Sequence, residues 1–250
     1  MKNNQIFDEC NLLGFKIFKD DLKLLVSHAL AKTGTSVINT LNPHSFVTQR
    51  DDQEFRSALM ASDFLLPDGI GICLAEKVIN NGSMTRISGF ELFSEVSKQL
   101  NDIDGKVLFL GSTPRVLDKI RKRMEADFSH VTVEIFSPPF KKSFEDHDIQ
   151  VFREEISKFK PDVIFVGLTA PKQEKLIAQL GHCSGVKIMC GIGAVFDFYS
   201  GVVQRPSKFW RRLHLEWFIR FLSEPRRLFG RNFISTPLFL IYILKEKFIN

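Results

Sequence analysis

The chain has 250 residues, of which 44% are hydrophobic and 25% charged, a composition that excludes a disordered or fibrous protein. Residues 1–5 lack the apolar core of a signal peptide. Residues 203–250 hold ten Lys and Arg against three Asp and Glu, whereas residues 1–202 hold 24 against 26. We therefore predict a near-neutral body at 1–202 and a basic appendage at 203–250.

Apolar runs of strand character alternate with amphipathic stretches along the body. A short strand and turn region is expected at 5–18. The strands that follow are predicted at 36–40, 62–67, 106–111, 131–136, 162–168 and 186–193. Helices are predicted at 20–32, 50–61, 72–79, 144–159 and 172–179, with two more opening at 88 and 114. This alternation predicts an α/β fold with a mostly parallel, Rossmann-like sheet flanked by helices.

The second predicted strand of the sheet ends on an acid that two glycines follow. Asp68 would therefore lie at the carboxyl end of a strand, which is where ligands bind in open α/β sheets. Gly69 and Gly71 would let the backbone approach a ligand closely. The alternative interpretation is that Asp68 caps the next helix and the glycines only form the turn.

Other polar residues also follow predicted strands, namely Thr40, Asn42, Gln173 and Asp197. In a parallel sheet these residues would gather with Asp68 at one edge and form a binding site. Each also has a plainer explanation, because Thr and Asn are common in turns and caps, and Gln173 would begin a helix. The gathering depends on the parallel topology.

Several motifs are absent. The sequence contains no G-x-x-x-x-G-K-[ST] phosphate loop, no complete G-x-G-x-x-G and no Asp-x-Asp suited to a divalent metal. Four cysteines without C-x-x-C spacing predict reduced thiols in a cytosolic protein. The six histidines are scattered and none is assigned a catalytic role, although His44 lies beside Asn42. No metal and no cofactor is predicted.

The basic appendage combines arginines with large apolar side chains. Trp210, Leu213 and Trp217 are three or four residues apart, which is helical spacing and leaves the other side basic. The apolar stretch 233–244 contains Pro237, which we expect to interrupt it, and is shorter than the ~20 residues that span a bilayer. A basic amphipathic helix of this kind suits an anionic membrane surface. Alternatively, its apolar face packs on the body and its arginines are solvated.

Taken together, the motifs resemble the WecG/TagA/CpsF family of bacterial glycosyltransferases (glycosyltransferase family 26). The resemblance runs from about Thr40 to Phe233, and it depends on the order and spacing of several short pieces. These are TLNP (40–43), PDGIG (67–71), GFELF (89–93), GLTAPKQE (167–174), GIGAVFDF (191–198), LEWFIR (215–220) and EPRR (224–227), with Gly201 and Arg205.

This resemblance implies a function in the biosynthesis of cell-surface polysaccharides. The family transfers a sugar, such as N-acetylmannosamine or its uronic acid, from a UDP-sugar to an undecaprenyl-diphosphate-linked glycan. The reaction inverts the anomeric carbon and needs no metal. The resemblance further implies a peripheral protein on the cytoplasmic face of the plasma membrane, with no nucleic-acid partner. A homo-oligomer is left open.

The resemblance also implies a role for particular residues. Asp68 would be the general base, with Thr40 and Asn42 flanking the sugar and the acceptor hydroxyl. Gln173 and Asp197 would bind the donor, Asp197 toward the uracil, and Phe140 would stand at the base-stacking position. Arg220 and Arg227 of the appendage would close over the diphosphate, a role that suits bidentate guanidinium groups.

One departure from the family pattern concerns the donor. Many members have Asp where this chain has Glu91, so the extra methylene is expected to alter a sugar contact. Besides a hydrolase or nucleotide-sugar modifying enzyme on the same sheet, two alternatives remain. One is the same fold acting on another UDP-hexose for exopolysaccharide synthesis, and the other is a non-enzymatic module that binds membranes or nucleic acid through the basic appendage.

Overall fold

A computed structural model describes residues 7–204, 206–207, 209–210 and 216–249. Its centre is a sheet of six strands in the order β4-β3-β8-β7-β5-β6. Every neighbouring pair is parallel, which confirms the predicted fold class. The strands are β3 (Ser36–Leu41), β4 (Phe64–Pro67), β5 (Lys106–Gly111), β6 (Thr132–Phe136), β7 (Val163–Gly167) and β8 (Ile188–Gly191).

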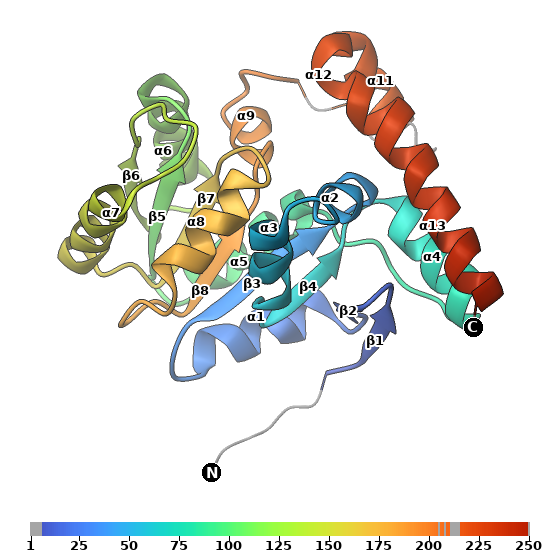
Figure 1. Cartoon of the computed structure of the whole chain (residues 1–250). Helices are drawn as coiled ribbons and strands as arrows, with labels where there is room; N and C mark the ends of the chain where they lie inside the picture. Colours follow the sequence, from blue (N-terminus) through green and yellow to red (C-terminus); the bar gives the residue numbers. More distant parts are fainter. Residues whose placement is uncertain (1–6, 205, 208, 211–215, 250) are drawn as a thin grey trace.

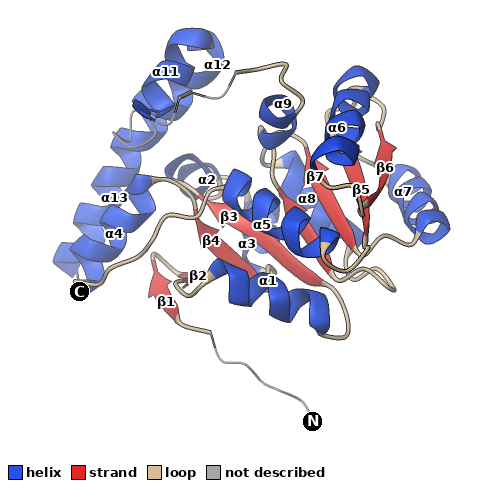
Figure 2. Cartoon of the chain, turned by 180° about the vertical axis from the view of Figure 1, so that it is seen from behind, coloured by secondary structure: helices blue, strands red, loops and turns tan. Residues whose placement is uncertain are grey.

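Helices cover both faces of the sheet. Figure 1 looks onto the face covered by α3 (Gln53–Met60), α7 (Asp146–Phe159) and α8 (Lys172–Leu180). The opposite face, toward the viewer in Figure 2, carries α1 (Leu22–Ala31), α5 (Gly89–Asn101), α6 (Pro114–Asp127) and α9 (Val195–Tyr199). Because both faces are covered, strands such as β7 are buried along their whole length and read as continuous apolar runs.

Three elements lie beside β4. The hairpin β1 (Glu9–Leu12) and β2 (Phe15–Phe18) agrees with the strand and turn region expected there. Helix α4 (Ile70–Asn80) follows β4, and α2 (Pro43–Thr48) follows β3. Sequence analysis missed α2, because no helix was predicted between the strand at 36–40 and the helix at 50–61. Proline is in fact well suited to the first turn of a helix, where its missing N–H is not needed.

From Glu216 to Ile249 the appendage is helical and returns to the body. It comprises α11 (Glu216–Ser223), α12 (Pro225–Phe229), the π-helix η1 (Gly230–Ser235) and α13 (Thr236–Ile249). Phe239 and Ile243 of α13 are buried in the same apolar cluster as Phe46 of α2 and Ile72 of α4. Figures 1 and 2 both show α13 lying along α4. One face of the appendage therefore packs on the body.

The expectation that Pro237 interrupts the last apolar stretch was wrong. Pro237 is the second residue of α13, where its missing N–H is tolerated, and the π-helix η1 leads directly into that helix. Within the described ranges, no helix is both long and apolar enough to cross a membrane.

Candidate active site at the carboxyl edge of the sheet

The central pair of predicted site residues lies on two neighbouring strands. Leu41 of β3 is in register with Pro67 of β4, and the backbone N–H of Asp68 donates to the carbonyl of Leu41 at 2.8 Å. Asn42 directly follows β3 and Asp68 directly follows β4. Because neighbouring strands are about 4.8 Å apart, these two residues lie side by side. Thr40 lies one register pair earlier, opposite Leu66. The predicted gathering of polar residues at this edge is confirmed for these three.

Asp68 lies one residue before the N-cap of the next helix. That N-cap is Gly69, with φ 96° and no capping side chain, and the alternative interpretation of Asp68 stays open. A positive φ is costly for any residue with a Cβ, which explains the glycine. The half-buried Asp68 occupies the end of a strand, at the edge where parallel sheets bind ligands.

Asn42 has a structural task of its own. Its Oδ1 accepts from the backbone N–H of Ser45 at 3.0 Å and caps α2. The cap that sequence analysis held open for Asn42 is therefore confirmed. It fixes the carbonyl end of the side chain, and the amide NH₂ is the donor group that the cap does not use.

Gly71 brings three elements together. A Cβ at Gly71 would lie 2.6 Å from Cγ of Pro43 and 3.4 Å from Cε1 of Phe239. The missing side chain thus lets α2 and α13 pack directly against the first turn of α4. This packing is a sufficient reason for glycine here, and the predicted approach of its backbone to a ligand stays a prediction.

Gln173 fastens two loops at the same edge. Its Oε1 accepts from the backbone N–H of Gly193 at 2.8 Å and of Leu168 at 3.4 Å, so it joins the segments after β8 and β7. A Cβ at Gly191 would approach its Nε2 to 2.3 Å, so this position has to be glycine. Gln173 is 5% exposed, so it is a buried residue that holds these two loops together beneath the site. Asp197 lies on α9, four residues after Gly193.

Sequence analysis missed Glu174, which orients the side chain of Gln173 through a hydrogen bond. Its Oε1 accepts from Nε2 of Gln173 at 3.1 Å, and among the described residues no partner meets its buried Oε2. Glu174 is 3% exposed, and burial raises the pKa of its carboxyl from 4.5 to about 7. The available signal was its spacing, because Glu174 lies three residues before the buried Ile177 on the inner face of α8.

Phe140 is fully exposed on the loop after β6, and β6 and β4 form opposite edges of the sheet. Lys141 of this loop pairs with Asp148 at 2.8 Å, and Lys172, at the start of α8, donates to the carbonyl of Lys141. The residue after Phe140 is therefore held beside the residue before Gln173. The stacking role of Phe140 stays a prediction.

Helices α11 and α12 place Arg220 and Arg227 in the appendage, but the side chains of both, and the whole of Arg205, lie outside the described residues. His44 links the appendage to the loop that carries Asn42. Its Nδ1 is 2.9 Å from Oγ of Ser235 in η1. Burial, together with the nearby Arg231, lowers the pKa of His44, which favours the neutral ring.

Glu91, where the chain departs from the family pattern, completes the cap of α5. Its Oε2 accepts from the backbone N–H of Ser88 at 2.6 Å and from Oγ of Ser88 at 2.8 Å. Its other oxygen is 3.7 Å from Arg86. This reciprocal arrangement is a capping box with Glu91 at the third helical position.

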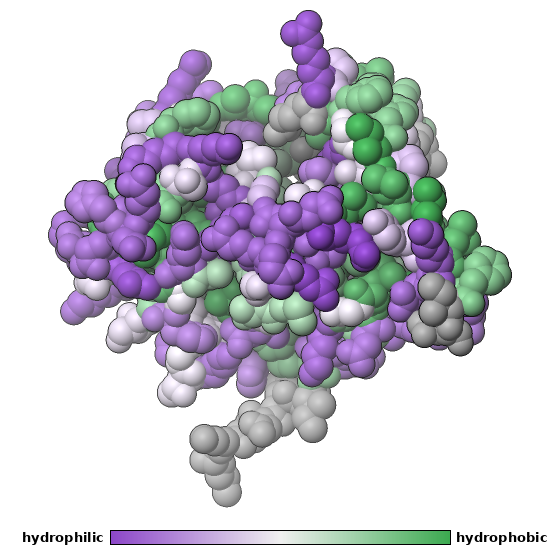
Figure 3. Space-filling view, viewed as in Figure 1, coloured by the Kyte–Doolittle hydropathy of each residue, from purple (hydrophilic) through white to green (hydrophobic). Residues whose placement is uncertain are grey.

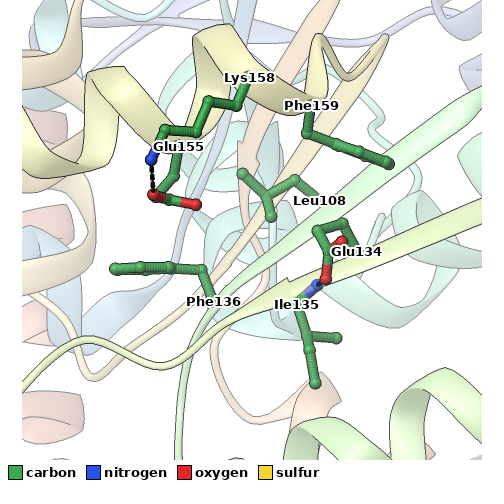
Figure 4. Close-up of a pocket in the computed structure, with 7 residues that line it drawn as sticks. All are labelled: Leu108, Glu134, Ile135, Phe136, Glu155, Lys158 and Phe159. Carbon is green, nitrogen blue, oxygen red and sulfur yellow. Dashed lines mark hydrogen bonds and ion pairs between the residues drawn. The ribbon is translucent and has the colours of Figure 1, made fainter.

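Two surface cavities lie away from Asp68. One of about 420 Å³, shown in Figure 4, lies between the edge strand β6 and α7, and Glu155 and Lys158 form an ion pair of 2.7 Å on its rim. The other, of about 370 Å³, is lined by Phe90, Phe198 and the segment that leads to the appendage. No predicted site residue lines either cavity. All four cysteines are free, and no metal-binding group of three or more His, Cys, Asp or Glu occurs among the described residues.

The fold is an open parallel α/β sheet with a carboxylate beside an amide at its carboxyl edge, where sheets of this class bind ligands. The chain belongs to the glycosyl transferase WecG/TagA/CpsF family, whose model matches residues 10–250. The resemblance stated from the motifs is thereby confirmed, and the protein is a glycosyltransferase.

Three relatives share one name, N-acetylglucosaminyldiphosphoundecaprenol N-acetyl-beta-D-mannosaminyltransferase. The Bacillus spizizenii protein is 30% identical over 231 residues, which is 91% of this chain and 87% of the relative. The Bacillus subtilis protein is 28% identical over 223 residues, 89% and 84% of the two chains. The protein of Staphylococcus aureus strain MRSA252 is 27% identical over 215 residues, 86% and 82%.

Proposed function

We propose that this glycosyltransferase moves an N-acetylmannosaminyl group from a UDP donor to N-acetylglucosamine on undecaprenyl diphosphate. The observation that carries the proposal is the shared name of relatives that match at least 86% of this chain. The side-by-side placement of Asp68 and Asn42 supports it, because a transfer to a hydroxyl needs a base near a group that can orient that hydroxyl.

In the proposed reaction, an acceptor hydroxyl attacks the anomeric carbon from the side opposite UDP. The new carbon–oxygen bond forms as the bond to the β-phosphate oxygen breaks, and the electron pair of that bond leaves with UDP. Asp68 takes the proton of the attacking hydroxyl. The sugar inverts, and the negative charge that develops on UDP requires cationic groups. We assign that task to Arg220 and Arg227, with no metal involved.

The remaining residues hold the substrates. Thr40 and the amide NH₂ of Asn42 flank the acceptor hydroxyl and the sugar, beside the backbone of Gly69. Asp197 lies after β8, next to β3 in the sheet, and we assign it to the uracil. Gln173 acts by holding the backbone of Gly193 in position. We assign Phe140, on the exposed loop after β6, to stacking on the base.

We place the protein on the cytoplasmic face of the membrane, where a lipid-linked acceptor and a UDP-sugar can meet. The appendage at 203–250 would provide the membrane contact and complete the site. Its basic charge supports this assignment, because anionic lipids attract Lys and Arg. A non-enzymatic binding module would use the same charge without binding UDP, so a calorimetric titration with UDP separates the two functions.

Asp68→Asn tests the mechanism. Loss of a general base lowers turnover by about 10²–10⁴-fold. We expect a loss of this size with UDP-N-acetylmannosamine and a polyprenyl-diphosphate N-acetylglucosamine acceptor, with product detected by mass, whereas UDP affinity is retained. Asp118→Asn, on the exposed side of α6, is the matched control. Turnover of Asp68→Asn within tenfold of wild type removes Asp68 from its role, and a preference for another UDP-hexose in the same assay overturns the donor assignment.

A further inference from the structure

Helix α13 is apolar on the side that the body covers and on the side that it leaves open. Phe239 and Ile243 are buried against the body, yet Leu240, Ile241, Leu244 and Phe248 are between 41% and 84% exposed. A surface helix of a water-soluble protein normally turns polar residues outward. A helix that is apolar all round is suited to contact with a second apolar phase.

The exposed apolar surface continues onto α4, in the catalytic body. Ile70 is 51% exposed and Leu74 is 43% exposed. Residues of an α-helix are 100° apart, so Leu74 lies 60° from Gly71, the position that touches Phe239 of α13. Leu74 therefore borders the contact between the two helices, and Ile70 lies one turn before it on the same outer face.

We name these six side chains the apolar ridge: Ile70, Leu74, Leu240, Ile241, Leu244 and Phe248. Figure 3 shows hydrophobic residues gathered along the side of the molecule that α13 and α4 form. Contiguous exposed apolar patches are rare on monomeric proteins and mark interaction sites.

The polar residues beside the ridge indicate what covers it. Lys77 of α4 and Lys245 and Lys247 of α13 are exposed in the same two helices, and these helices carry Glu76, which is buried, and Glu246 as their acids. An apolar face flanked by lysines fits the boundary between acyl chains and anionic headgroups.

We propose that the apolar ridge is a membrane-docking surface to which the catalytic body contributes through α4. The proposal rests on the lipid-linked acceptor of the proposed function, and it assigns membrane contact to residues that precede the appendage. Ile70 is two residues after Asp68, and consecutive Cα atoms are about 3.8 Å apart, so the two Cα atoms lie within about 7.6 Å. The first turn of α4 would thus hold Asp68 close to the headgroups, where the diphosphate of a polyprenyl lipid lies.

The test uses the full chain and vesicles without any UDP-sugar or acceptor, so its outcome does not depend on activity. Vesicles of equal phosphatidylglycerol and phosphatidylethanolamine are mixed with wild type, with Ile70→Ser/Leu74→Ser and with Met60→Ser/Ile103→Ser. Met60 and Ile103 are exposed apolar residues outside the ridge, at 58% and 55%, and provide the matched control. Binding is measured by flotation, and folding by circular dichroism and thermal unfolding.

We expect the ridge variant to bind at least about tenfold more weakly, because two half-exposed side chains no longer leave water on docking. The control variant should bind within twofold of wild type. Equal binding of the ridge variant and wild type overturns the contribution of α4, and no binding by wild type overturns the docking surface. Dimers that dissociate only in the ridge variant, with unchanged vesicle binding, would make the ridge an interface between two copies. If vesicle binding follows the expectation while sugar transfer fails, only the proposed function falls.

Discussion

The buried carboxyl of Glu174 permits a quantitative prediction. Glu174→Gln keeps the shape of the side chain and an oxygen that can accept from Nε2 of Gln173, but it removes the titrating group. In wild type, burial raises the pKa of this carboxyl from 4.5 to about 7. The folded protein therefore favours the protonated form, whereas the unfolded chain ionises at a lower pH.

The sign and size of the effect follow by linkage. A group with a raised pKa contributes stability that is fully present below pH 4.5 and is lost as the pH rises through about 7. Each tenfold change in proton affinity corresponds to about 1.4 kcal/mol, so wild type loses up to about 3 kcal/mol across this window from this one group. Glu174→Gln does not undergo that loss of stability, because glutamine does not ionise. Its unfolding free energy should rise relative to wild type as the pH increases.

Urea unfolding of both proteins at pH values between 5 and 8.5 measures the difference. Subtracting the two curves removes the titration of all the other groups. Glu125→Gln, on the exposed side of α6, provides the control and should track wild type at every pH. A difference between Glu174→Gln and wild type that does not depend on pH would show that the Glu174 carboxyl has the same pKa in the folded and the unfolded chain. The reasoning about its buried, unpartnered oxygen would then be refuted.

Two further predictions concern the loop and the helix that surround Asp68. Asn42→Ala should lower the unfolding free energy by about 1 kcal/mol through loss of the α2 cap, whereas Asn42→Ser keeps an oxygen for Ser45 and most of the stability. Both should lose transfer activity, and full activity of Asn42→Ser would refute a role for the amide. Phe239→Ala should cost about 3–5 kcal/mol and Phe248→Ala little, because Phe239 is fully buried and Phe248 is 84% exposed. Equal melting temperatures for these two variants would refute the docking of α13 on the body.

The sequence was sufficient for the sheet and for part of the site because the responsible signals are local. Each strand of the sheet lies within a short apolar run, and strands that alternate with helices pair in parallel. Parallel pairing alone places the ends of β3 and β4 at one edge. The proximity of Asn42 and Asp68 therefore needed only the correct fold class. The order of all six strands depends on packing between distant segments and has no local signal.

The features that sequence analysis missed depend on contacts between residues far apart in the chain. Pro43 begins a helix because its Asn42 cap and its contact with Gly71 stabilise that helix. Glu174 sits in a run of charged residues, and only tertiary packing shows that this one faces inward. The spacing of the appendage predicted an apolar helical face. It did not predict that α13 would use one side for the body and leave the other side apolar as well.

The packing of Gly71 between Pro43 and Phe239 has a mechanical consequence. With no free volume at this point, a displacement of α13 has to be taken up by the first turns of α2 and α4. These helices start one residue after Asn42 and two residues after Asp68. A force applied to the end of the chain by its surroundings would therefore reach the spacing between these two side chains without any hinge. Substitutions that change side-chain size at positions 43, 71 and 239 would have to compensate one another to keep the distance between Asn42 and Asp68.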